Sequence, residues 1–336
     1  MIFFQNIFIH LKTKLKKIKK NPKKKKLKKI KKIKKKMNNI STNITDYPHL
    51  TLVDNKKASG FPDEINKFQF DNFILFKKEC MKQKLIPNFN YYDDYYLLKF
   101  CRARKFDLEK ILIMFKNFLQ WRREKKVDII DEYFHFDEIL KIKKIYPHGY
   151  HKTDKLGRPI YIELISKINL DELFKTTTDD RLVLYYIQEY ERLMKYRFPC
   201  CSKMMGKIID QSFTILDLEG IGVSNLFGRT KKFLQIATSI GQDYYPENMG
   251  VMFLINTSGF FTFLWAIVKK FLDPKTVSKI QIEGKHYKDK LLEFIDEENL
   301  PSIIGGSCTC SHIDGGCLFS DIGPWNPSGG IPQMPD

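Results

Sequence analysis

Two enzyme signatures are missing from the sequence. It contains no Gly-x-Ser-x-Gly segment, which marks a nucleophilic serine, and no Gly-x4-Gly-Lys-Ser/Thr loop, which binds nucleotide phosphates. Serine hydrolysis and nucleotide hydrolysis therefore lack their usual sequence support. A Gly-x-Gly pair follows a predicted strand at Gly220 and Gly222, but Asn225 stands where a dinucleotide site has its third glycine. Gly220 is explained more simply as the end of the strand.

Acidic residues are absent from residues 11–36, which contain 17 lysines. This segment supplies most of the net charge of +19, and the rest of the chain is nearly neutral, so we expect no nucleic-acid partner. A block of like charges repels itself and favours a solvated, disordered tail. The alternative is an amphipathic helix on an anionic membrane, because Phe4, Phe8, Leu11 and Leu15 recur at helical spacing.

A long apolar run is also missing from the start of the chain. The apolar residues 1–10 are too few to span a bilayer, and the lysines follow them instead of preceding them as in a secretory signal. We therefore expect a cytosolic protein with reduced thiols. The cysteines are odd in number: Cys80, Cys101, Cys200, Cys201, Cys308, Cys310 and Cys317.

The segment CTCSHIDGGC contains four residues of types that bind zinc: Cys308, Cys310, His312 and Cys317. The Cys-x2-Cys spacing of common zinc sites is absent, so the pattern favours a thiol-rich loop without metal. A zinc site stays the alternative.

The pattern of residues divides the chain into four parts. A tail and polar linker occupy residues 1–62, and residues 63–140 show only helical patterns. The clearest helix is 107–126, with Asp107 as its predicted N-cap and one apolar stripe. Residues 141–307 form an α/β domain, and residues 308–336 form an extension that we expect to pack on it.

Strands and helices alternate through the α/β domain. Strands are predicted at 158–165, 208–218, 251–256 and 279–283, and helices lie near 179–198, 223–243 and 259–272. This spacing predicts a largely parallel sheet.

Two hydroxyl groups stand out on the strand SFTILDLEG. Ser212 and Thr214 share one strand face, and both faces look buried. A buried hydroxyl without a partner costs about 1–3 kcal/mol, so each needs a backbone acceptor, a water or a ligand. Tyr150, Tyr161 and Tyr190 could bring aromatic rings near these hydroxyls and receive a quaternary ammonium, although each alone is more often a core residue.

The predicted helix 259–272 is apolar on every side, which is typical of a buried core helix or of a mobile lid over an apolar cavity. Basic residues cluster at CRARKFD and DPKTVSKI. Such clusters are usually solvated surface, but two of them can hold a phosphate if the fold brings them together.

Eight runs, in this order, resemble the CRAL-TRIO lipid-exchange family and most closely its Sec-fourteen-like phosphatidylinositol/phosphatidylcholine transfer proteins. They cover roughly residues 93–326 and are LLKFCRARKFDLEK, YHKTDKLGRPIY, YRFPCCSK, SFTILDLEGI, QDYYPENMG, FLDPKTVSKI, ENLPSIIGG and LFSDIGPW. The resemblance implies a helical N-terminal subdomain followed by an α/β domain that encloses one phospholipid beneath an apolar gate helix.

The resemblance also assigns residues to two headgroup sites and a gate. The phosphatidylcholine headgroup would contact Ser212, Thr214, Tyr150, Tyr161 and Tyr190, and the phosphatidylinositol headgroup would contact Arg104, Lys105, Glu247, Thr276 and Lys279. The gate would consist of Phe260, Phe261, Phe263, Leu264, Trp265, Ile267, Val268 and Phe271. Gly306 matches a glycine needed for the fold, and Asn248 departs from the family, which often has arginine there.

The resemblance implies a carrier that performs no covalent chemistry and needs no cofactor other than its phospholipid cargo. It would exchange phosphatidylinositol and phosphatidylcholine at membrane surfaces and present the inositol lipid to kinases. It would work from the cytosol on membranes such as those of the Golgi or endosomes. The alternatives are a lipid sensor that keeps its ligand and signals through a protein partner, and a zinc- or thiol-dependent enzyme on the same scaffold.

Overall fold

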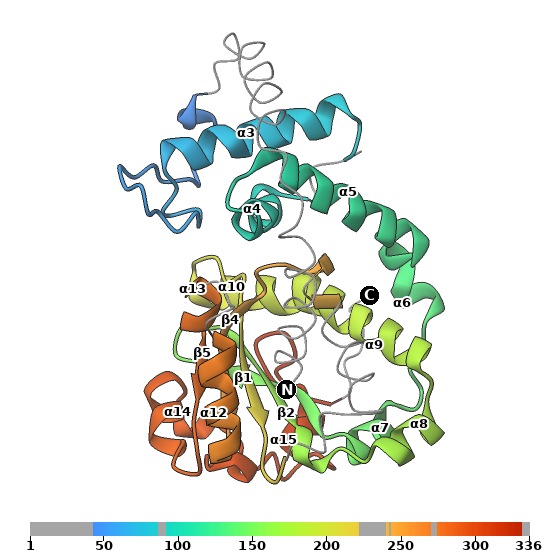
Figure 1. Cartoon of the computed structure of the whole chain (residues 1–336). Coiled ribbons are helices and arrows are strands. Elements are labelled where there is room, and N and C mark those ends of the chain that lie inside the picture. Colours follow the sequence, from blue (N-terminus) through green and yellow to red (C-terminus); the bar gives the residue numbers. More distant parts are fainter. Residues whose placement is uncertain (1–42, 87–91, 222–239, 242, 270–273, 331–336) are drawn as a thin grey trace. The chain divides into compact units, whose positions relative to one another are not determined.

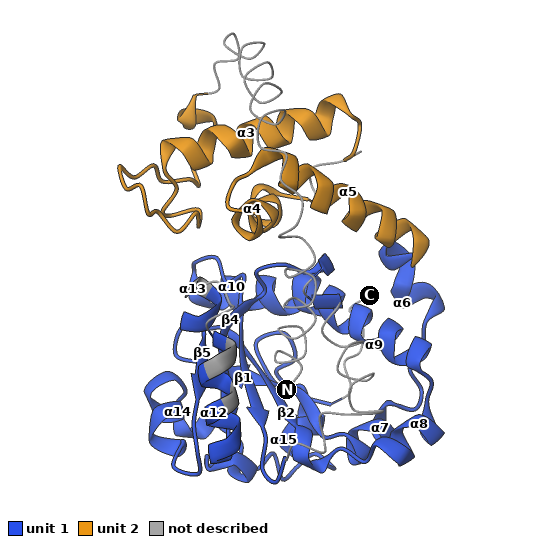
Figure 2. Ribbon diagram, in the orientation of Figure 1, with its two compact units in different colours: residues 1–7, 126–336 blue, residues 8–125 orange. Residues whose placement is uncertain are grey.

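The computed structural model describes residues 43–86, 92–221, 240–241, 243–269 and 274–330 (Figure 1). It forms two compact units that meet in sequence at Lys125 and Lys126 (Figure 2). The sequence pattern places the end of the helical part near residue 140, about 15 residues later. The residues between these two boundaries form short helices, which the structure groups with the second unit. The lysine-rich segment 11–36 lies outside the described residues.

The N-terminal unit is helical, as predicted. Its elements are η1 (Ile44–Asp46), α3 (Lys67–Lys82), α4 (Asp94–Ala103) and α5 (Leu108–Glu124). The side chain of Asp107 accepts a hydrogen bond from the backbone of Lys110, so Asp107 is the N-cap of α5 as predicted. Ile111, Phe115 and Phe118 on the predicted stripe of α5 are fully buried.

The second unit contains a five-stranded sheet in the order β1-β2-β3-β4-β5 (Figure 1). The strands are β1 (His148–Thr153), β2 (Pro159–Leu164), β3 (Ser212–Asp217), β4 (Met249–Ile255) and β5 (Ile280–Ile282). The pairing of β1 with β2 is antiparallel, and the other three pairings are parallel. The largely parallel sheet is thus confirmed, although the sequence pattern did not single out β1.

Helices connect and follow these strands. They are η2 (Val127–Ile129), α6 (Ile130–Tyr133), α7 (Ile139–Ile145), η3 (Ile165–Lys167), α8 (Leu170–Thr176), α9 (Asp179–Arg192), the π-helical η4 (Leu193–Arg197), α10 (Phe198–Met205), α12 (Gly259–Val268), α13 (Pro274–Ser278), α14 (Lys288–Phe294), η7 (Glu297–Asn299), η8 (Ser302–Ile304) and α15 (Cys317–Ser320). The predicted helices 179–198 and 259–272 correspond to α9 with η4 and to α12. Most of the predicted helix 223–243 lies outside the described residues.

The two faces of the sheet have different characters. One face is apolar: Ile162, Ile215 and Phe253 are paired neighbours on it and belong to one core cluster with Leu291 of α14. Successive side chains of a strand point to opposite faces, so Tyr161, Glu163 and Thr214 on the inner strands lie on the other face. The polar side chains predicted to bind a headgroup therefore lie on the face away from the apolar core.

The position of Gly306 permits no side chain. A Cβ atom there would lie 1.9 Å from the carbonyl oxygen of Leu300. The backbone N–H of Gly306 also donates to Pro301 at 3.0 Å, which fixes the chain in this close approach. Gly220, with a φ of 69°, lies in the turn after β3 and so marks the end of a strand, as predicted.

No helix within the described ranges combines the length and the apolar character needed to cross a bilayer.

Candidate functional site

Three residues of the predicted choline site form one row across the sheet. Tyr150 on β1 pairs with Tyr161 on β2, and Tyr161 pairs with Thr214 on β3. Directly paired residues of neighbouring strands point to the same face, so the three side chains are lateral neighbours. The rings of Tyr150 and Tyr161 have centroids 5.1 Å apart. The row continues on β4 with Met252.

Tyr190 reaches this row from α9. It packs with Tyr150 and Tyr161 around a small cluster that includes Leu193 and Phe198. Its ring stacks on that of Tyr245, with centroids 4.6 Å apart and planes at 7°. Burial raises the pKa of Tyr190 to about 12, so its hydroxyl stays protonated and can donate a hydrogen bond at neutral pH. The structure thus brings together the three tyrosines predicted from sequence.

The hydroxyl of Ser212 has a protein acceptor. Ser212 Oγ donates to the backbone oxygen of Asn248 at 3.2 Å, and the backbone N–H of Ser212 donates to the same oxygen at 2.8 Å. Both Ser212 and Thr214 are buried, with exposed fractions of 7% and 9%. The cost of burying the Ser212 hydroxyl is therefore already offset by a backbone bond. The lipid-binding role of Ser212 stays a prediction.

Sequence reasoning missed an arginine side chain that lies over the ring of Tyr150. The guanidinium carbon of Arg197 lies 4.1 Å from the centroid of Tyr150. The same guanidinium donates to Glu189 and to Asp321 of the C-terminal extension, each at 3.0 Å. A cation from the protein therefore covers one face of Tyr150 and ties this ring to the extension.

A buried carboxyl group lies on the same sheet face, two residues from Tyr161. Glu163 is 3% exposed, and its Oε1 has no hydrogen-bond partner among the described residues. Burial raises the pKa of Glu163 to about 7, while a hydrogen bond from Tyr146 acts in the opposite direction. The sequence feature that could have indicated this buried carboxyl group is the acidic residue inside the apolar strand RPIYIELI.

Histidine and tyrosine side chains surround this carboxyl group. His148 pairs with Glu163 across the strands. The Nδ1 of His148 lies 2.7 Å from the backbone oxygen of Tyr146 and its Nε2 lies 2.7 Å from the hydroxyl of Tyr185, so Nδ1 donates and Nε2 accepts. Burial lowers the pKa of His148 to about 3, which keeps the ring neutral. The histidine and tyrosine side chains around Glu163 are thus neutral at pH 7.

Two residues of the predicted inositol site form an ion pair. Lys279 Nζ lies 3.4 Å from Glu247 Oε2 and donates to the backbone oxygen of Met249 at 2.9 Å. The carbonyl of Thr276 accepts the backbone N–H of Lys279 at 3.2 Å, so all three predicted residues of this unit lie close together. Glu247 has a φ of 61° and precedes Asn248, the acceptor of the Ser212 hydroxyl.

Arg104 and Lys105 belong to the N-terminal unit. Arg104 is the C-cap of α4, and Lys105 lies exposed in the turn before α5 with a φ of 51°. Their part in an inositol phosphate site stays a prediction.

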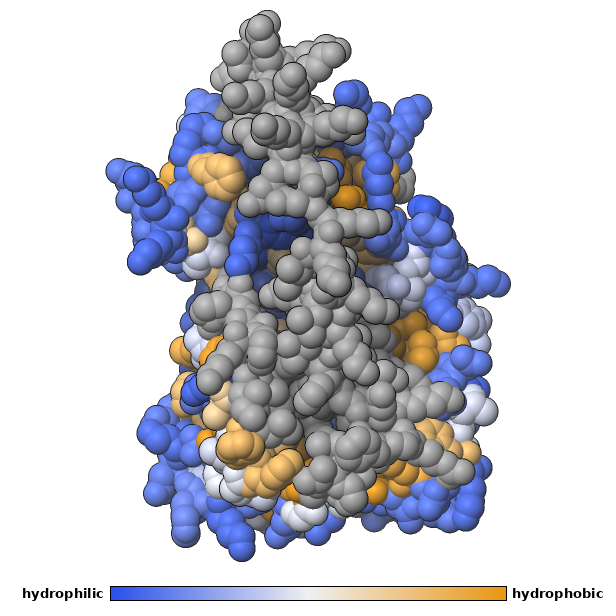
Figure 3. All heavy atoms as spheres, in the orientation of Figure 1, coloured by the Kyte–Doolittle hydropathy of each residue, from blue (hydrophilic) through white to orange (hydrophobic). Residues whose placement is uncertain are grey.

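The predicted gate helix is amphipathic in its exposure. On α12, Phe261 and Trp265 are buried, with exposed fractions of 4% and 8%, whereas Phe260 and Phe263 are 46% and 65% exposed. Figure 3 shows that hydrophobic side chains reach the surface of this unit in several places. Phe271 and the side chains of Leu264, Ile267 and Val268 lie outside what the structure describes. A helix with two exposed phenylalanines is not a plain core helix.

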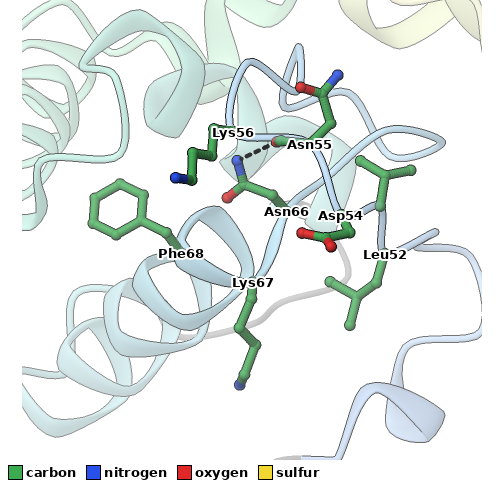
Figure 4. Close-up of a pocket in the computed structure, with 8 residues that line it drawn as sticks. Leu52, Asp54, Asn55, Lys56, Asn66, Lys67 and Phe68 are labelled. Carbon is green, nitrogen blue, oxygen red and sulfur yellow. Dashed lines mark hydrogen bonds between the residues drawn. The ribbon is translucent and has the colours of Figure 1, made fainter.

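A separate hollow of about 550 Å³ lies in the N-terminal unit, between residues 52–56 and 66–68 (Figure 4). Within it, the side-chain nitrogen of Asn66 donates to the backbone oxygen of Asn55 at 3.0 Å. Its lining includes Asp54, Lys56 and Lys67 and none of the predicted headgroup or gate residues. This charged hollow is therefore not the predicted lipid site.

The zinc alternative grouped His312 with Cys308, Cys310 and Cys317, but the structure brings His151 to these cysteines instead. His312 is exposed and does not belong to the group of metal-binding side chains that the structure brings together. The three predicted cysteines do belong to that group, which is described below.

Comparison with known proteins identifies relatives along most of the chain. The model of the CRAL/TRIO domain matches residues 143–306, and that of the CRAL/TRIO N-terminal domain matches residues 11–117. The chain is 41% identical over 288 residues to the Sec14 cytosolic factor of Schizosaccharomyces pombe, covering 85% of this chain and 97% of that protein. It is 47% identical over 233 residues to the SEC14 cytosolic factor of Kluyveromyces lactis, covering 69% and 77%.

A third relative is longer. The chain is 46% identical over 264 residues to the phosphatidylinositol/phosphatidylcholine transfer protein SFH7 of Arabidopsis thaliana, covering 79% of this chain and 48% of the relative. The chain thus spans about half the length of this relative. Among solved structures, the crystal structure of Sfh5 matches with a TM-score of 0.50 and 19% identity, covering 66% of this chain and 82% of that one. This last likeness supports the fold alone.

Proposed function

This chain belongs to the CRAL/TRIO family, and from that membership we propose that it binds one phospholipid at a time and exchanges phosphatidylinositol and phosphatidylcholine between membranes. The names of the relatives support this proposal, because the Arabidopsis proteins are called phosphatidylinositol/phosphatidylcholine transfer proteins. The reaction is physical transfer and needs no covalent chemistry.

The observation that carries the proposal is the row formed by Tyr150, Tyr161 and Thr214 on the sheet face opposite the apolar core. Aromatic rings attract a quaternary ammonium by about 0.5–2 kcal/mol each, and a hydroxyl can donate to a phosphate oxygen. These are the two groups of a phosphocholine. Because the row lies inside the unit, a lipid bound there has its headgroup buried as well as its acyl chains.

The exposed phenylalanines of α12 support the exchange step. Burial contributes about 0.8 kcal/mol per methylene, so a two-chain lipid hardly ever leaves a bilayer unaided. A carrier needs an apolar surface that meets the bilayer while the lipid passes. Phe260 and Phe263 provide such a surface next to the buried Phe261 and Trp265.

The inositol lipid would use the second group of residues. A lysine supplies a compact positive charge and an arginine supplies a planar fork for a phosphate. We assign Lys279, paired with Glu247, and the Arg104–Lys105 turn to this role. Presentation of the bound inositol lipid to kinases, from the cytosol at Golgi or endosomal membranes, is the biological context that we propose.

The test has two parts. Mass spectrometry of lipids that co-purify with the full chain should find phosphatidylinositol and phosphatidylcholine, and recovery of sterol alone would contradict the assignment. Purified protein should then move each labelled lipid from donor to acceptor vesicles. A protein that retains its lipid in this assay would instead be a lipid sensor that signals through a partner.

A further inference from the structure

Four side chains of metal-binding types converge at the edge of the sheet, and none of them is a residue assigned to the lipid. They are His151 of β1 and Cys308, Cys310 and Cys317 of the C-terminal extension, and their ligand atoms all lie within 4.8 Å of one another. His151, Cys310 and Cys317 are buried and Cys308 is half-buried. None of the three cysteines is in a disulfide.

The backbone is shaped to bring these side chains together. The register of β1 shifts between Tyr150 and Thr153, which is the signature of a bulge at His151 and Lys152. Bulges redirect side chains at sheet edges. The chain then returns through Gly316, which has a φ of 66° and lies so close to Thr309 that a Cβ atom would be 3.2 Å from its carbonyl oxygen. This turn places Cys317 beside the Cys308–Cys310 pair.

Hydrogen bonds fix the orientation of the histidine ring. His151 Nδ1 lies 3.1 Å from Ser320 Oγ, and Ser320 Oγ donates its own proton to the carbonyl of Cys317 at 2.7 Å. Because the Ser320 hydroxyl donates its only proton to Cys317, it can only accept a hydrogen bond from His151. The Nδ1 of His151 is therefore protonated and donates to Ser320. The other nitrogen, Nε2, then holds a free lone pair, and it is buried without a hydrogen-bond partner among the described residues.

This arrangement is the one that a metal-binding histidine needs. Ligating imidazoles donate through their second nitrogen to a fixed acceptor, which sets the tautomer and the ring plane. Ser320 is that acceptor here. His151 contributes one ring nitrogen to the cluster of ligand atoms, and Nε2 is the nitrogen that is left without a partner. A buried nitrogen with no partner is costly unless something occupies the site.

The sulfur geometry fits a tetrahedral ion. Cys308 Sγ and Cys310 Sγ are 3.7 Å apart. Zinc–sulfur bonds of about 2.3 Å at tetrahedral angles separate two sulfurs by about 3.8 Å. A disulfide would need about 2.05 Å. Three thiolates and a divalent ion have a net charge of about −1, and the nearby Lys152 ammonium, which acts electrostatically on Cys308, opposes that charge.

We propose that His151, Cys308, Cys310 and Cys317 bind one zinc ion and so fasten the C-terminal extension to β1. Four protein ligands fill a tetrahedral shell and leave no position for water or substrate, so the site is structural. Zinc binding at this site is a property separate from lipid transfer. The same extension nevertheless contacts the proposed lipid site, because Asp321 pairs with Arg197, which lies on the ring of Tyr150.

The experiment is metal analysis of the full-length protein, purified without chelator. We expect about one zinc ion per chain, and we expect cobalt added to the chelated protein to give the intense visible bands of a tetrahedral thiolate site. His151→Gln and Cys310→Ser should each lower bound zinc at least about tenfold. Ser320→Ala should keep the ligands but weaken zinc affinity by about 10–100-fold.

Matched controls separate this site from adventitious binding. His312→Gln changes the exposed histidine of the same segment, and Cys200→Ser changes a half-buried cysteine elsewhere, so both should keep full zinc content. If a ligand variant fails to fold, the cobalt spectrum of the wild type and the release of its zinc by thiol reagents still test whether the cysteines bind the metal. Protein that takes up no metal, a mass lower by two hydrogens from a disulfide, or loss of zinc in His312→Gln alone would each overturn the proposal.

Discussion

Ser212 Oγ donates a hydrogen bond to the backbone carbonyl of Asn248 across 3.2 Å. Asn248 directly follows Glu247, and Glu247 forms the ion pair with Lys279. A residue assigned to the choline site therefore holds the loop of a residue assigned to the inositol site. The two proposed headgroup sites are thus connected through Ser212, whereas Thr214 lies two residues further along β3.

This connection separates the expected effects of the two hydroxyls. Thr214→Val removes one donor without changing the shape, and a hydrogen bond to a charged phosphate contributes about 1.5–3 kcal/mol, so phosphatidylcholine transfer should fall at least about tenfold. Phosphatidylinositol transfer should change little. Ser212→Ala should reduce transfer of both lipids, because it also removes one of the two hydrogen bonds that Ser212 donates to the carbonyl of Asn248. Vesicle transfer of each lipid measures this, and equal losses of both lipids in Thr214→Val would refute a distinct choline site.

The inositol site should respond in the opposite way. Lys279→Ala removes the cation of the pair with Glu247 and should lower phosphatidylinositol transfer at least about tenfold while sparing phosphatidylcholine. Arg104→Ala should give the same selectivity if the N-terminal unit contributes. Lys285→Ala, an exposed lysine after β5, is the control for a general loss of charge. Unchanged inositol transfer in Lys279→Ala would remove Lys279 from the site.

The gate helix can be tested at its exposed positions. Phe260→Asp and Phe263→Asp together should abolish transfer and lower the melting temperature little, because both side chains belong to the exposed residues of α12. Trp265→Asp is a poor test, since Trp265 is 8% exposed and a buried carboxylate would destabilise the domain. Full transfer by the folded double variant would show that α12 does not meet the membrane.

Gly306 provides a test of the fold. Gly306→Ala forces a Cβ atom onto the carbonyl of Leu300, and such overpacking costs about 1–3 kcal/mol or more. Gly284→Ala is the matched control, because a Cβ there meets nothing within 4 Å. Thermal unfolding followed by circular dichroism should show a lower midpoint for the first variant only. Equal midpoints would mean that the backbone near Leu300 yields easily.

The sequence predicted the parallel strands because each is a short apolar run between helices, as in RPIYIELI. It missed β1, whose residues HGYHKT show no apolar alternation. These side chains are buried by partners far away in sequence, such as Tyr185 for His148 and Ser320 for His151. Such partners are set by tertiary structure and leave no local pattern.

The candidate site shows the same limit. Period-two reasoning placed Ser212 and Thr214 on one face, but it leaves the register with neighbouring strands open by any even shift. The row from Tyr150 to Thr214 was therefore predictable only through the family resemblance. Likewise, local spacing pointed to His312 as a ligand, whereas the histidine that joins the cysteines is His151 on a strand more than 150 residues earlier.

The buried Glu163 should make stability depend on pH. Its folded pKa of about 7 lies above the ordinary value of about 4.5, so the unfolded chain releases the proton first as the pH rises. The contribution of Glu163 is thus most favourable below about pH 4.5 and is lost as the pH rises to about 7. Glu163→Gln keeps the shape and cannot ionise, so at pH 8 it should be more stable than wild type by on the order of 2–3 kcal/mol.

Other buried groups titrate in the same range, so the informative quantity is the difference between wild type and Glu163→Gln. Burial lowers the pKa of His148 to about 3 and of His151 to about 4, and these shifts give stability that is lost as the pH falls through 6 towards 4. They are present in both proteins and cancel in the difference. Urea unfolding at pH 4.5, 6 and 8 should therefore give a difference that grows from near zero. A constant difference across this range would show that Glu163 is ionised throughout, and the carboxylate would then need a cationic partner.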